Sequence, residues 1–410
     1  MRAAVDDQTE RGRELAAGHL HLVGQEREPH VTRAGSEYEI AFGPHRYGFS
    51  VGEGSDAWSA LASQLAALDA DRFAVVTEPG VPLHFAQELV QHISRNVGEA
   101  VLLSFPPGER GKTMTAVNDL AERALRSGLT RRSVVVAFGG GLAGNVAGLL
   151  AALLFRGIRL VHAPTTLLAM SDSVLSLKQA VNSGVGKNHI GTFYTPEFVW
   201  NNLDYLESLP ADEIRGALCE TIKNVLVISP QRLDELAGML DPDCAYSADE
   251  FRHIIDVCVE AKTSVMADDP HERGEALVLE YGHTIGHAIE LVSEGTMTHG
   301  LAIGVGMLIA ARAARLLGVL DEDSECKHWE LLELNGAPTR LPAGVAPAQV
   351  LAAARLDNKR GYLRQRPDHR DMILIEGIGR PLRSGGSLLT QVPERLVAES
   401  LEAVAQAVAA

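Results

Sequence analysis

The stretch SVVVAFGGGLAGNVAGLLAALLF, residues 133–155, predicts a buried strand, a glycine turn and an apolar helix. Gly139, Gly140 and Gly141 form the turn, and Gly144 lies where the helix begins. Because glycine has no side chain, the backbone there can approach a pyrophosphate, and the free amides at the helix N-terminus supply donors and partial positive charge. A tight strand-to-helix turn without a ligand gives the same pattern, so the stretch alone leaves both interpretations open.

The pattern of strands and helices extends from Glu37 to Pro210. Amphipathic helical stretches alternate there with short β-rich runs, which are EYEIAFG (37–43), FAVVTE (73–78), AVLLSF (100–105), SVVVAF (133–138) and IRLVHAP (158–164). This alternation predicts an α/β domain with a largely parallel sheet.

The chain changes character near Pro210. Long helical patterns dominate from Glu213 to about Val319, and two candidate strands, DMILIEGIG (371–379) and PLRSGGSLLTQV (381–392), precede a final helix from Pro393. We therefore expect an α/β domain over residues 37–210 and a mainly α-helical domain over residues 211–410. Residues 1–36 mix acidic, basic and polar residues, and we expect a disordered N-terminal tail there.

Composition and charge exclude several classes of partner. The net charge of −16 and the pI near 5.4 argue against nucleic acid and anionic membranes, because such partners need a cationic face. The tail has no compact apolar run, so we expect neither a secretory signal nor a membrane anchor. The four cysteines, which show neither CxxC nor zinc-finger spacing, fit a cytoplasmic protein best; they are Cys219, Cys244, Cys258 and Cys326.

Polar residues recur at the predicted strand ends. Glu78 ends FAVVTE, and a carboxylate in that place can bind ribose hydroxyls, although here it precedes the glycine turn instead of following it. PPGERGKT adds Glu109 and Lys112, and HAPTTLLAMSDS adds Thr165, Thr166 and Asp172. Each alone is more typical of a cap or turn. Their joint placement favours a dinucleotide crevice.

Cationic residues gather in SLKQAVNSGVGKNHIGTFY, residues 176–194. Lys178, Lys187 and Asn188 lie there in a turn-rich stretch, which in an acidic protein is also compatible with a solvated loop. Farther on, Glu220 and Lys223 share one helical face, and a surface ion pair is the alternative interpretation.

Two histidines stand four apart in LEYGHTIGHAIE, residues 279–290, which reads as a helix. His283 and His287 share one face of it, and His299 begins the apolar helix that follows. With Glu220, two imidazoles make a normal set of ligands for a divalent metal, although core packing explains the pair equally well. The HxxxH spacing lacks the glutamate of HExxH, which argues against that metalloprotease chemistry.

Together, GGGLAGN, PTTLLAMSDS, GKN, CETIKN and EYGHTIGHAIE followed by THG resemble the sugar phosphate cyclases, the 3-dehydroquinate synthase family. The resemblance covers nearly everything from Glu37 onward. It implies a dehydroquinate synthase-like fold with an N-terminal NAD-binding α/β domain and a mainly α-helical C-terminal metal-binding domain, usually as a homodimer. It also implies NAD+, one divalent cation (Co2+ or Zn2+) and a small-molecule sugar phosphate as partners.

The resemblance assigns roles to residues by position. It implies the metal ligands Glu220, His283 and His299, and the catalytic residues Lys178, Lys223, Glu272 and His287, the last beside the substrate. It implies NAD-binding positions at Glu78, Glu109, Lys112, Gly139, Gly140, Gly141, Thr165, Thr166, Asp172 and Lys187. It implies substrate positions at Arg156, Asn188, Lys262, Glu280 and Lys359, with Arg156 reaching the neighbouring subunit's phosphate site.

Departures from the family pattern indicate the substrate. Dehydroquinate synthases carry an arginine and an asparagine where this chain has Ala276 and Glu280, and those two residues contact a substrate carboxylate. Losing the guanidinium and adding an anion would leave such a carboxylate without its bidentate partner, so the substrate should lack one.

Three stretches indicate a branch of the family. SDSVLSLKQAVN, CETIKNVL and DNKRGY resemble the cyclases that open the 2-deoxystreptamine aminoglycoside pathways, whose substrate is glucose 6-phosphate. The resemblance implies oxidation by NAD, phosphate elimination, reduction, ring opening and aldol closure. Valiolone-forming cyclases that use sedoheptulose 7-phosphate and dehydroquinate synthase itself are the alternatives within the family, and a metal-dependent polyol dehydrogenase is the alternative of another class.

Overall fold

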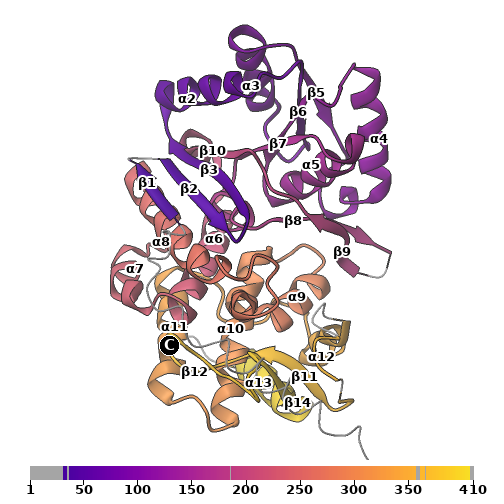
Figure 1. Cartoon of the computed structure of the whole chain (residues 1–410). Helices are drawn as coiled ribbons and strands as arrows, with labels where there is room; N and C mark the ends of the chain where they lie inside the picture. The colour runs from indigo at the N-terminus through magenta and orange to yellow at the C-terminus, as the bar shows by residue number, and fades with distance from the viewer. Residues whose placement is uncertain (1–30, 35–36, 185, 357–360, 365, 407–410) are drawn as a thin grey trace, which may run out of the picture. The chain divides into compact units, whose positions relative to one another are not determined.

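The computed structural model describes residues 31–34, 37–184, 186–356, 361–364 and 366–406 of the 410-residue chain. Its first layer is an eight-stranded sheet in the order β1-β2-β3-β10-β7-β6-β4-β5 (Figure 1). The strands β3, β10, β7, β6, β4 and β5 run parallel, and β1 and β2 continue the sheet antiparallel. The strand bounds are Val31–Ala34, Glu37–Phe42, His45–Gly52, Phe73–Thr77, Ala100–Ser104, Val134–Gly139, Arg159–Pro164 and Phe198–Asn202 for β1 to β7 and β10.

Helices cover both faces of the parallel part of the sheet. Every residue of β4 and β6 is buried, and alternate side chains enter different cores. Val134 and Val136 pack toward α2 and α3, whereas Val135 and Ala137 pack toward α4 and α5. A strand that is buried on both faces consists of consecutive apolar residues, so the run SVVVAF predicts such a strand. The helices are α2 (Gly54–Ala67), α3 (Leu83–Asn96), α4 (Met114–Arg126) and α5 (Gly141–Leu153).

The α/β prediction is confirmed, and it missed five strands. HRYGFSVG forms β3 and FVWNN forms β10, while the turn-rich stretch of residues 176–194 folds as a hairpin of β8 (Lys178–Ser183) and β9 (Gly186–Phe193). The fifth is β1, where the predicted disordered tail is wrong for residues 31–34, because their backbone pairs with β2. Residues 1–30 and 35–36 lie outside the described residues.

The second part of the chain is mainly helical, as predicted. Its helices are α6 (Ala211–Val227), α7 (Leu233–Met239), α8 (Ala248–Met266), α9 (His283–Val292), α10 (His299–Leu316), α11 (Glu322–Leu334), α12 (Pro347–Ala353) and α13 (Glu394–Gln406). Two small antiparallel pairs join β11 (His369–Ile373) to β14 (Leu389–Pro393) and β12 (Ile375–Gly377) to β13 (Arg380–Pro381). Apolar side chains of β2, β3, α6 and α10 share one core. The predicted boundary at residue 210 therefore marks a change of secondary structure. That it also separates two domains stays a prediction.

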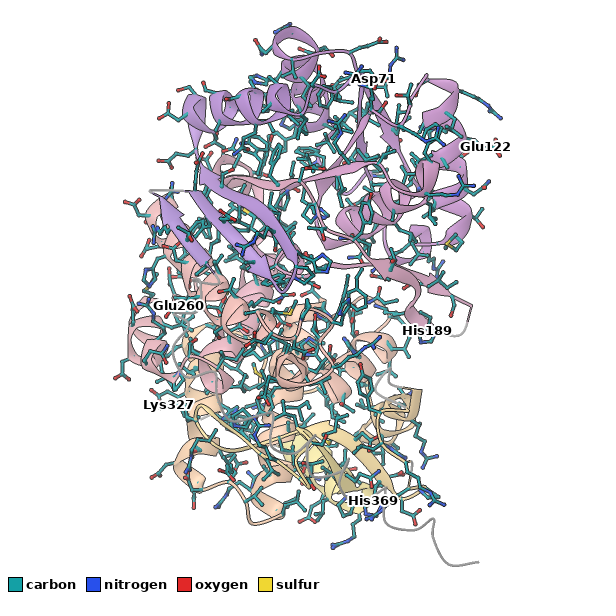
Figure 2. All side chains as sticks on the ribbon, in the orientation of Figure 1. Asp71, Glu122, His189, Glu260, Lys327 and His369 are labelled. Atoms are coloured by element: carbon teal, nitrogen blue, oxygen red, sulfur yellow. The ribbon has the colours of Figure 1, made fainter. Side chains whose placement is uncertain are left out.

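Helix α10 is the central helix of this part. It has the length and apolar composition of a membrane span, yet 78% of it is buried. It packs against α6, α9, α11 and α13, as a core helix does. Charged side chains such as Glu122 and Glu260 are instead exposed at the periphery of the fold (Figure 2).

Glycines set the spacing of three helices. A Cβ built on Gly300 of α10 would lie 2.0 Å from the carbonyl oxygen of Gly216 in α6, and one on Gly306 would lie 2.2 Å from that of Gly282. No side chain fits at either crossing, so the backbones approach closely. The same crossings place Glu220, His283 and His299 on helices that are in direct contact.

Candidate active site

A cavity of about 1540 Å³ opens at the carboxyl ends of the parallel strands. Ligand pockets for one small molecule usually measure roughly 300–1,000 Å³, so this cavity has room for a dinucleotide and a second ligand. Its α/β wall contains ten of the residues predicted from the sequence, which are Glu78, Glu109, Lys112, Gly140, Gly141, Thr165, Thr166, Asp172, Lys187 and Asn188. His287, Glu290 and His299 line the opposite wall.

The glycine turn forms the floor of the dinucleotide side. Gly139 has a φ of +142°, which favours glycine, and its carbonyl oxygen accepts a hydrogen bond from the Thr165 amide at 3.0 Å. Gly140 precedes α5 and offers no side-chain cap, so amides of the first turn are available to a ligand. A Cβ on Gly141 would lie 3.2 Å from Ser173 Oγ, which leaves little space for any side chain. These features fit a pyrophosphate at the helix N-terminus.

Glu220, His283 and His299 bring three donor atoms to one point. Glu220 Oε1 lies 3.5 Å from His283 Nε2 and 3.6 Å from His299 Nε2, and it is buried without a hydrogen-bond partner in the described part of the chain. His283 Nδ1 donates to the Tyr281 carbonyl oxygen at 3.1 Å, because a carbonyl can only accept, so Nε2 of that ring carries the lone pair. A carboxylate oxygen facing imidazole lone pairs is stabilised by a cation between them, so these residues fit a divalent metal.

The charges around the two imidazoles agree with a cation at that point. Burial, and after it the Lys223 cation, lowers the pKa of His283 well below its usual value, so this ring is neutral. Burial also acts to lower the pKa of His299, but Glu290 and Glu220 outweigh it and raise that pKa. The acidic surroundings of His299 therefore favour a positive charge, which either a proton or a metal supplies.

His287 is a fourth donor beside the same point. The nearest ligand atoms of His283, His287 and His299 all lie within 4.8 Å of one another, so three histidines could also hold an ion. We favour Glu220 as the third ligand, because its Oε1 is fully buried and needs a positive partner. His287 lines the large cavity, whereas Glu220 and His283 do not, which leaves His287 facing a ligand.

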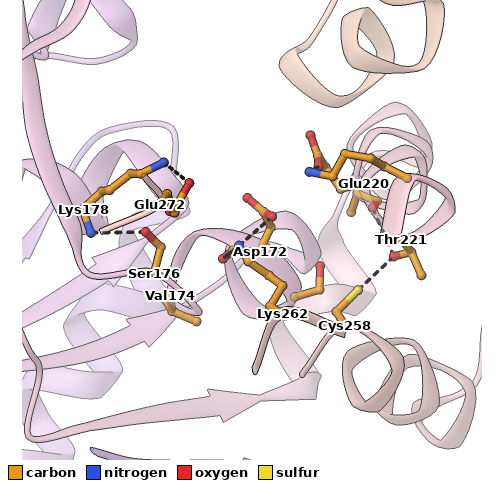
Figure 3. Close-up of polar contacts among 12 residues, drawn as sticks. Asp172, Val174, Ser176, Lys178, Glu220, Thr221, Cys258, Lys262 and Glu272 are labelled. Atoms are coloured by element: carbon orange, nitrogen blue, oxygen red, sulfur yellow. Dashed lines mark hydrogen bonds and ion pairs between the residues drawn. The ribbon is translucent and has the colours of Figure 1, made fainter. Parts of the chain in front are cut away.

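Three lysines lie near the metal residues, each bonded to a carboxylate, and Figure 3 labels two of them, Lys178 and Lys262. Lys178 donates to Glu272, and its Nζ lies 3.8 Å from Glu280 Oε1. Burial acts to lower the pKa of Lys178, but these two carboxylates outweigh it and raise that pKa. Lys223 donates to Glu220, and the balance of burial against neighbouring carboxylates likewise raises its pKa. Both lysines therefore remain cationic.

The third lysine holds the predicted cofactor residue Asp172. Lys262 Nζ donates to the backbone oxygen of Asp172 at 2.8 Å and to its Oδ1 at 2.9 Å. Burial acts to raise the pKa of Asp172, but Lys262 and Lys223 outweigh it and lower that pKa to about 2. This carboxylate is ionised at neutral pH.

The β8–β9 hairpin supplies one side of the cavity. Asn188, in the left-handed region with φ +56°, accepts a hydrogen bond from Lys112 Nζ at 2.5 Å. Lys187 Nζ donates to Glu290 Oε1 at 2.7 Å. Glu290 was not predicted, and its only sequence signal is its place three residues after His287 on the same helical face.

Among the described residues, one predicted residue does not join this cluster. Arg156 precedes β7, at the edge of the sheet opposite the glycine turn, and does not line the cavity. Its contact with a neighbouring subunit stays a prediction. Lys359 lies outside the described residues. The predicted helix over residues 279–290 is also shorter than expected, because Gly282 is left-handed at φ +79° and α9 begins at His283.

Comparison with known proteins places these residues in a family. Residues 102–216 match the model of the 3-dehydroquinate synthase N-terminal domain, and residues 217–360 match that of the C-terminal domain. A 2-deoxy-scyllo-inosose synthase of Streptoalloteichus tenebrarius is 46% identical over 368 residues, covering 90% of this chain and 95% of that protein.

Two solved structures are similar in fold. A 2-deoxy-scyllo-inosose synthase complexed with carbaglucose-6-phosphate, NAD+ and Co2+ superposes with a TM-score of 0.82 at 36% identity, covering 88% of this chain and 98% of that one. The 2-epi-5-epi-valiolone synthase of Streptomyces hygroscopicus subsp. jinggangensis, with NAD+ and Zn2+ bound, reaches 0.75 at 23% identity over 88% of this chain and 97% of its own, and at that identity it shows the fold alone. The chain belongs to the 3-dehydroquinate synthase family.

Proposed function

We propose that this protein converts D-glucose 6-phosphate to 2-deoxy-scyllo-inosose and phosphate, for 2-deoxystreptamine aminoglycoside biosynthesis. The observation that carries the proposal is one cavity with the glycine-lined N-terminus of α5 on one wall and His299 on the other, where His299 meets the buried Glu220 and His283. The 46% identity to a 2-deoxy-scyllo-inosose synthase selects the reaction within the family. The conversion comprises oxidation, phosphate elimination, reduction, ring opening and aldol closure, and it leaves NAD+ unchanged overall.

The glycine turn would hold NAD+, and Glu220, His283 and His299 would hold Co2+ or Zn2+. When bound, NAD+ accepts and returns a hydride, and the cation acidifies a substrate hydroxyl and polarises a carbonyl. Glu78 and Asp172, both on the cavity wall, are our candidates for contacts to the cofactor.

The lysines neutralise negative charge. Lys178, Lys223 and Lys262 lie beside the metal and cofactor residues and are our candidates to offset the charge of a phosphate or enolate. Asn188 adds a neutral donor on the hairpin side of the cavity.

We assign proton transfer to His287 and Glu272. The imidazole of His287 lines the cavity beside the metal residues, and its two ring nitrogens can take a proton at one atom and release it at another. The carboxylate of Glu272 accepts from Lys178 Nζ and can exchange a proton with substrate at the same place.

Glu280 accounts for selectivity against a substrate carboxylate. Its Oε1 lies 3.8 Å from Lys178 Nζ, and the residue stands where other family members carry the asparagine that meets a carboxylate. A substrate carboxylate there would face a like charge, whereas glucose 6-phosphate brings none.

We also propose a cytoplasmic homodimer in which Arg156 reaches the phosphate site of the neighbouring subunit. Arg156 is exposed, and it lies on the sheet edge away from its own cavity, as such a role requires. The four cysteines are free thiols, which suits a reducing compartment.

The test is incubation with glucose 6-phosphate, NAD+ and Co2+, followed by a phosphate assay, identification of the product and absorbance of NADH. Phosphate release, 2-deoxy-scyllo-inosose and no net NADH are expected. If the protein turned over sedoheptulose 7-phosphate but not glucose 6-phosphate, it would be a valiolone-forming cyclase. Net NADH from an alcohol without phosphate release would make it a polyol dehydrogenase.

A further inference from the structure

Glu290 connects two parts of the site that lie far apart in the sequence. It is on α9, one turn after His287, and its side chain is only 15% exposed. Its Oε2 lies 3.2 Å from His299 Nδ1, and its Oε1 accepts from Lys187 Nζ at 2.7 Å. One carboxylate therefore contacts a metal-site histidine and the β8–β9 hairpin.

We propose that Glu290 is a positioning residue that orients His299 toward the metal and holds the hairpin against the metal site. Because the carboxylate at Glu290 Oε2 can only accept, the proton of the neutral His299 ring lies on Nδ1 and the lone pair on Nε2, which faces Glu220. For His299, Glu290 thus does what the Tyr281 carbonyl does for His283.

His299 needs such a partner more than His283 does. Its side chain is 31% exposed, compared with 11% for His283, and it is the first residue of α10, where Thr298 gives no side-chain cap. A histidine on a helix end can rotate, and a carboxylate on the ring nitrogen that does not face the metal fixes both its tautomer and its orientation.

The second contact makes the hairpin depend on the same carboxylate. Lys187 precedes Asn188, which accepts from Lys112 on the cofactor side of the cavity. The metal and the hairpin are then coupled: a cation that fixes His299 also fixes Glu290, and so favours one position of Lys187.

The experiment measures metal binding without substrate or NAD+. Metal-free protein is titrated with Co2+ against a chromophoric chelator, and the cobalt absorption spectrum is recorded. Glu290→Gln, which is nearly isosteric, should bind Co2+ roughly 10- to 100-fold more weakly and with a changed spectrum. Glu333→Gln on an exposed helix position is the matched control and should bind as the parent does.

Two further variants separate orientation from folding. Glu290→Asp keeps the charge, but its side chain is one methylene shorter, so its carboxylate cannot reach both His299 and Lys187. It too should weaken Co2+ binding, and it is the variant to measure if Glu290→Gln does not fold. Lys187→Met should weaken binding less, and it should have little further effect in the Glu290→Gln background, because the coupling runs through that carboxylate.

The hairpin provides the last measurement. Co2+ should slow amide hydrogen exchange over residues 186–193 in the parent and fail to do so in Glu290→Gln. Because this inference rests on the proposed metal site, a parent that binds no Co2+ refutes that site. If the parent binds Co2+ and Glu290→Gln binds it with the same affinity and the same spectrum, the metal site stands and only the role of Glu290 is refuted.

Discussion

Replacing Gly306 by alanine should separate the helices that hold the metal residues. The added Cβ would lie 2.2 Å from the Gly282 carbonyl oxygen and 2.8 Å from the Gly286 nitrogen, whereas ordinary contact begins at 3.4 Å. The first contact is therefore too short by 3.4 − 2.2 = 1.2 Å. Both partners are backbone atoms, so the whole of α9 must move instead of a side chain.

The expected cost follows from two opposing effects. Overpacking against backbone costs about 3 kcal/mol, at the upper end of measured cases, and the better helix propensity of alanine recovers about 1 kcal/mol. A net loss of about 2 kcal/mol in the free energy of unfolding remains. Gly282 directly precedes His283, and metal–ligand distances hold within about 0.2 Å, so Co2+ should bind roughly 10- to 100-fold more weakly.

The assay is urea unfolding of the metal-free protein together with Co2+ titration. Gly238→Ala in α7 is the control, because its Cβ would meet nothing within 4 Å and should stabilise the helix by roughly 0.5–1 kcal/mol. If Gly306→Ala were as stable as the parent and bound Co2+ equally well, the close glycine crossing would not be what positions His283.

Three further predictions concern single side chains. His283→Ala should lose bound Co2+ and all activity, and stoichiometric metal in that variant would disprove its assignment as a ligand. His287→Ala and Lys178→Ala should each fold but turn over glucose 6-phosphate about a hundredfold more slowly, a loss of about 3 kcal/mol, and near-parent kcat would remove that residue from the mechanism. Because Lys262 and Lys223 lower the pKa of Asp172 to about 2 in the folded protein, its contribution to stability is present above its ordinary pKa and is lost as the pH falls toward 2. Between pH 6 and pH 3 the parent should therefore lose about 1 kcal/mol more unfolding free energy than Asp172→Asn, and equal losses would show that the pKa is not lowered.

The parallel sheet and its ligand edge were predictable from local pattern. An apolar run such as SVVVAF indicates a strand buried on both faces, and the carboxyl ends of parallel strands meet at one edge. The positions of Glu78 and Thr165 directly after strands therefore sufficed to predict that they share the cavity wall, whereas Asp172 reaches the same wall from the helical turn Ala169–Ser173.

The β8–β9 hairpin and the strands β1, β3 and β10 were missed because their sequences carry weak local signals. The β8–β9 stretch is rich in glycine, asparagine and lysine, which indicate turns, and long-range pairing decides its structure. Likewise, β10 pairs with β3 across some 150 residues, a contact that no window of sequence contains.

By itself the sequence determined the alternation of strands and helices, the glycine turn and, through its motifs, the family, because each is written in neighbouring residues. Only the tertiary structure decided that Glu290 contacts both His299 and Lys187, and that glycines let α10 approach α6 and α9. Those contacts join residues separated by as many as 103 positions, and they exist only once the helices have packed at a fixed distance.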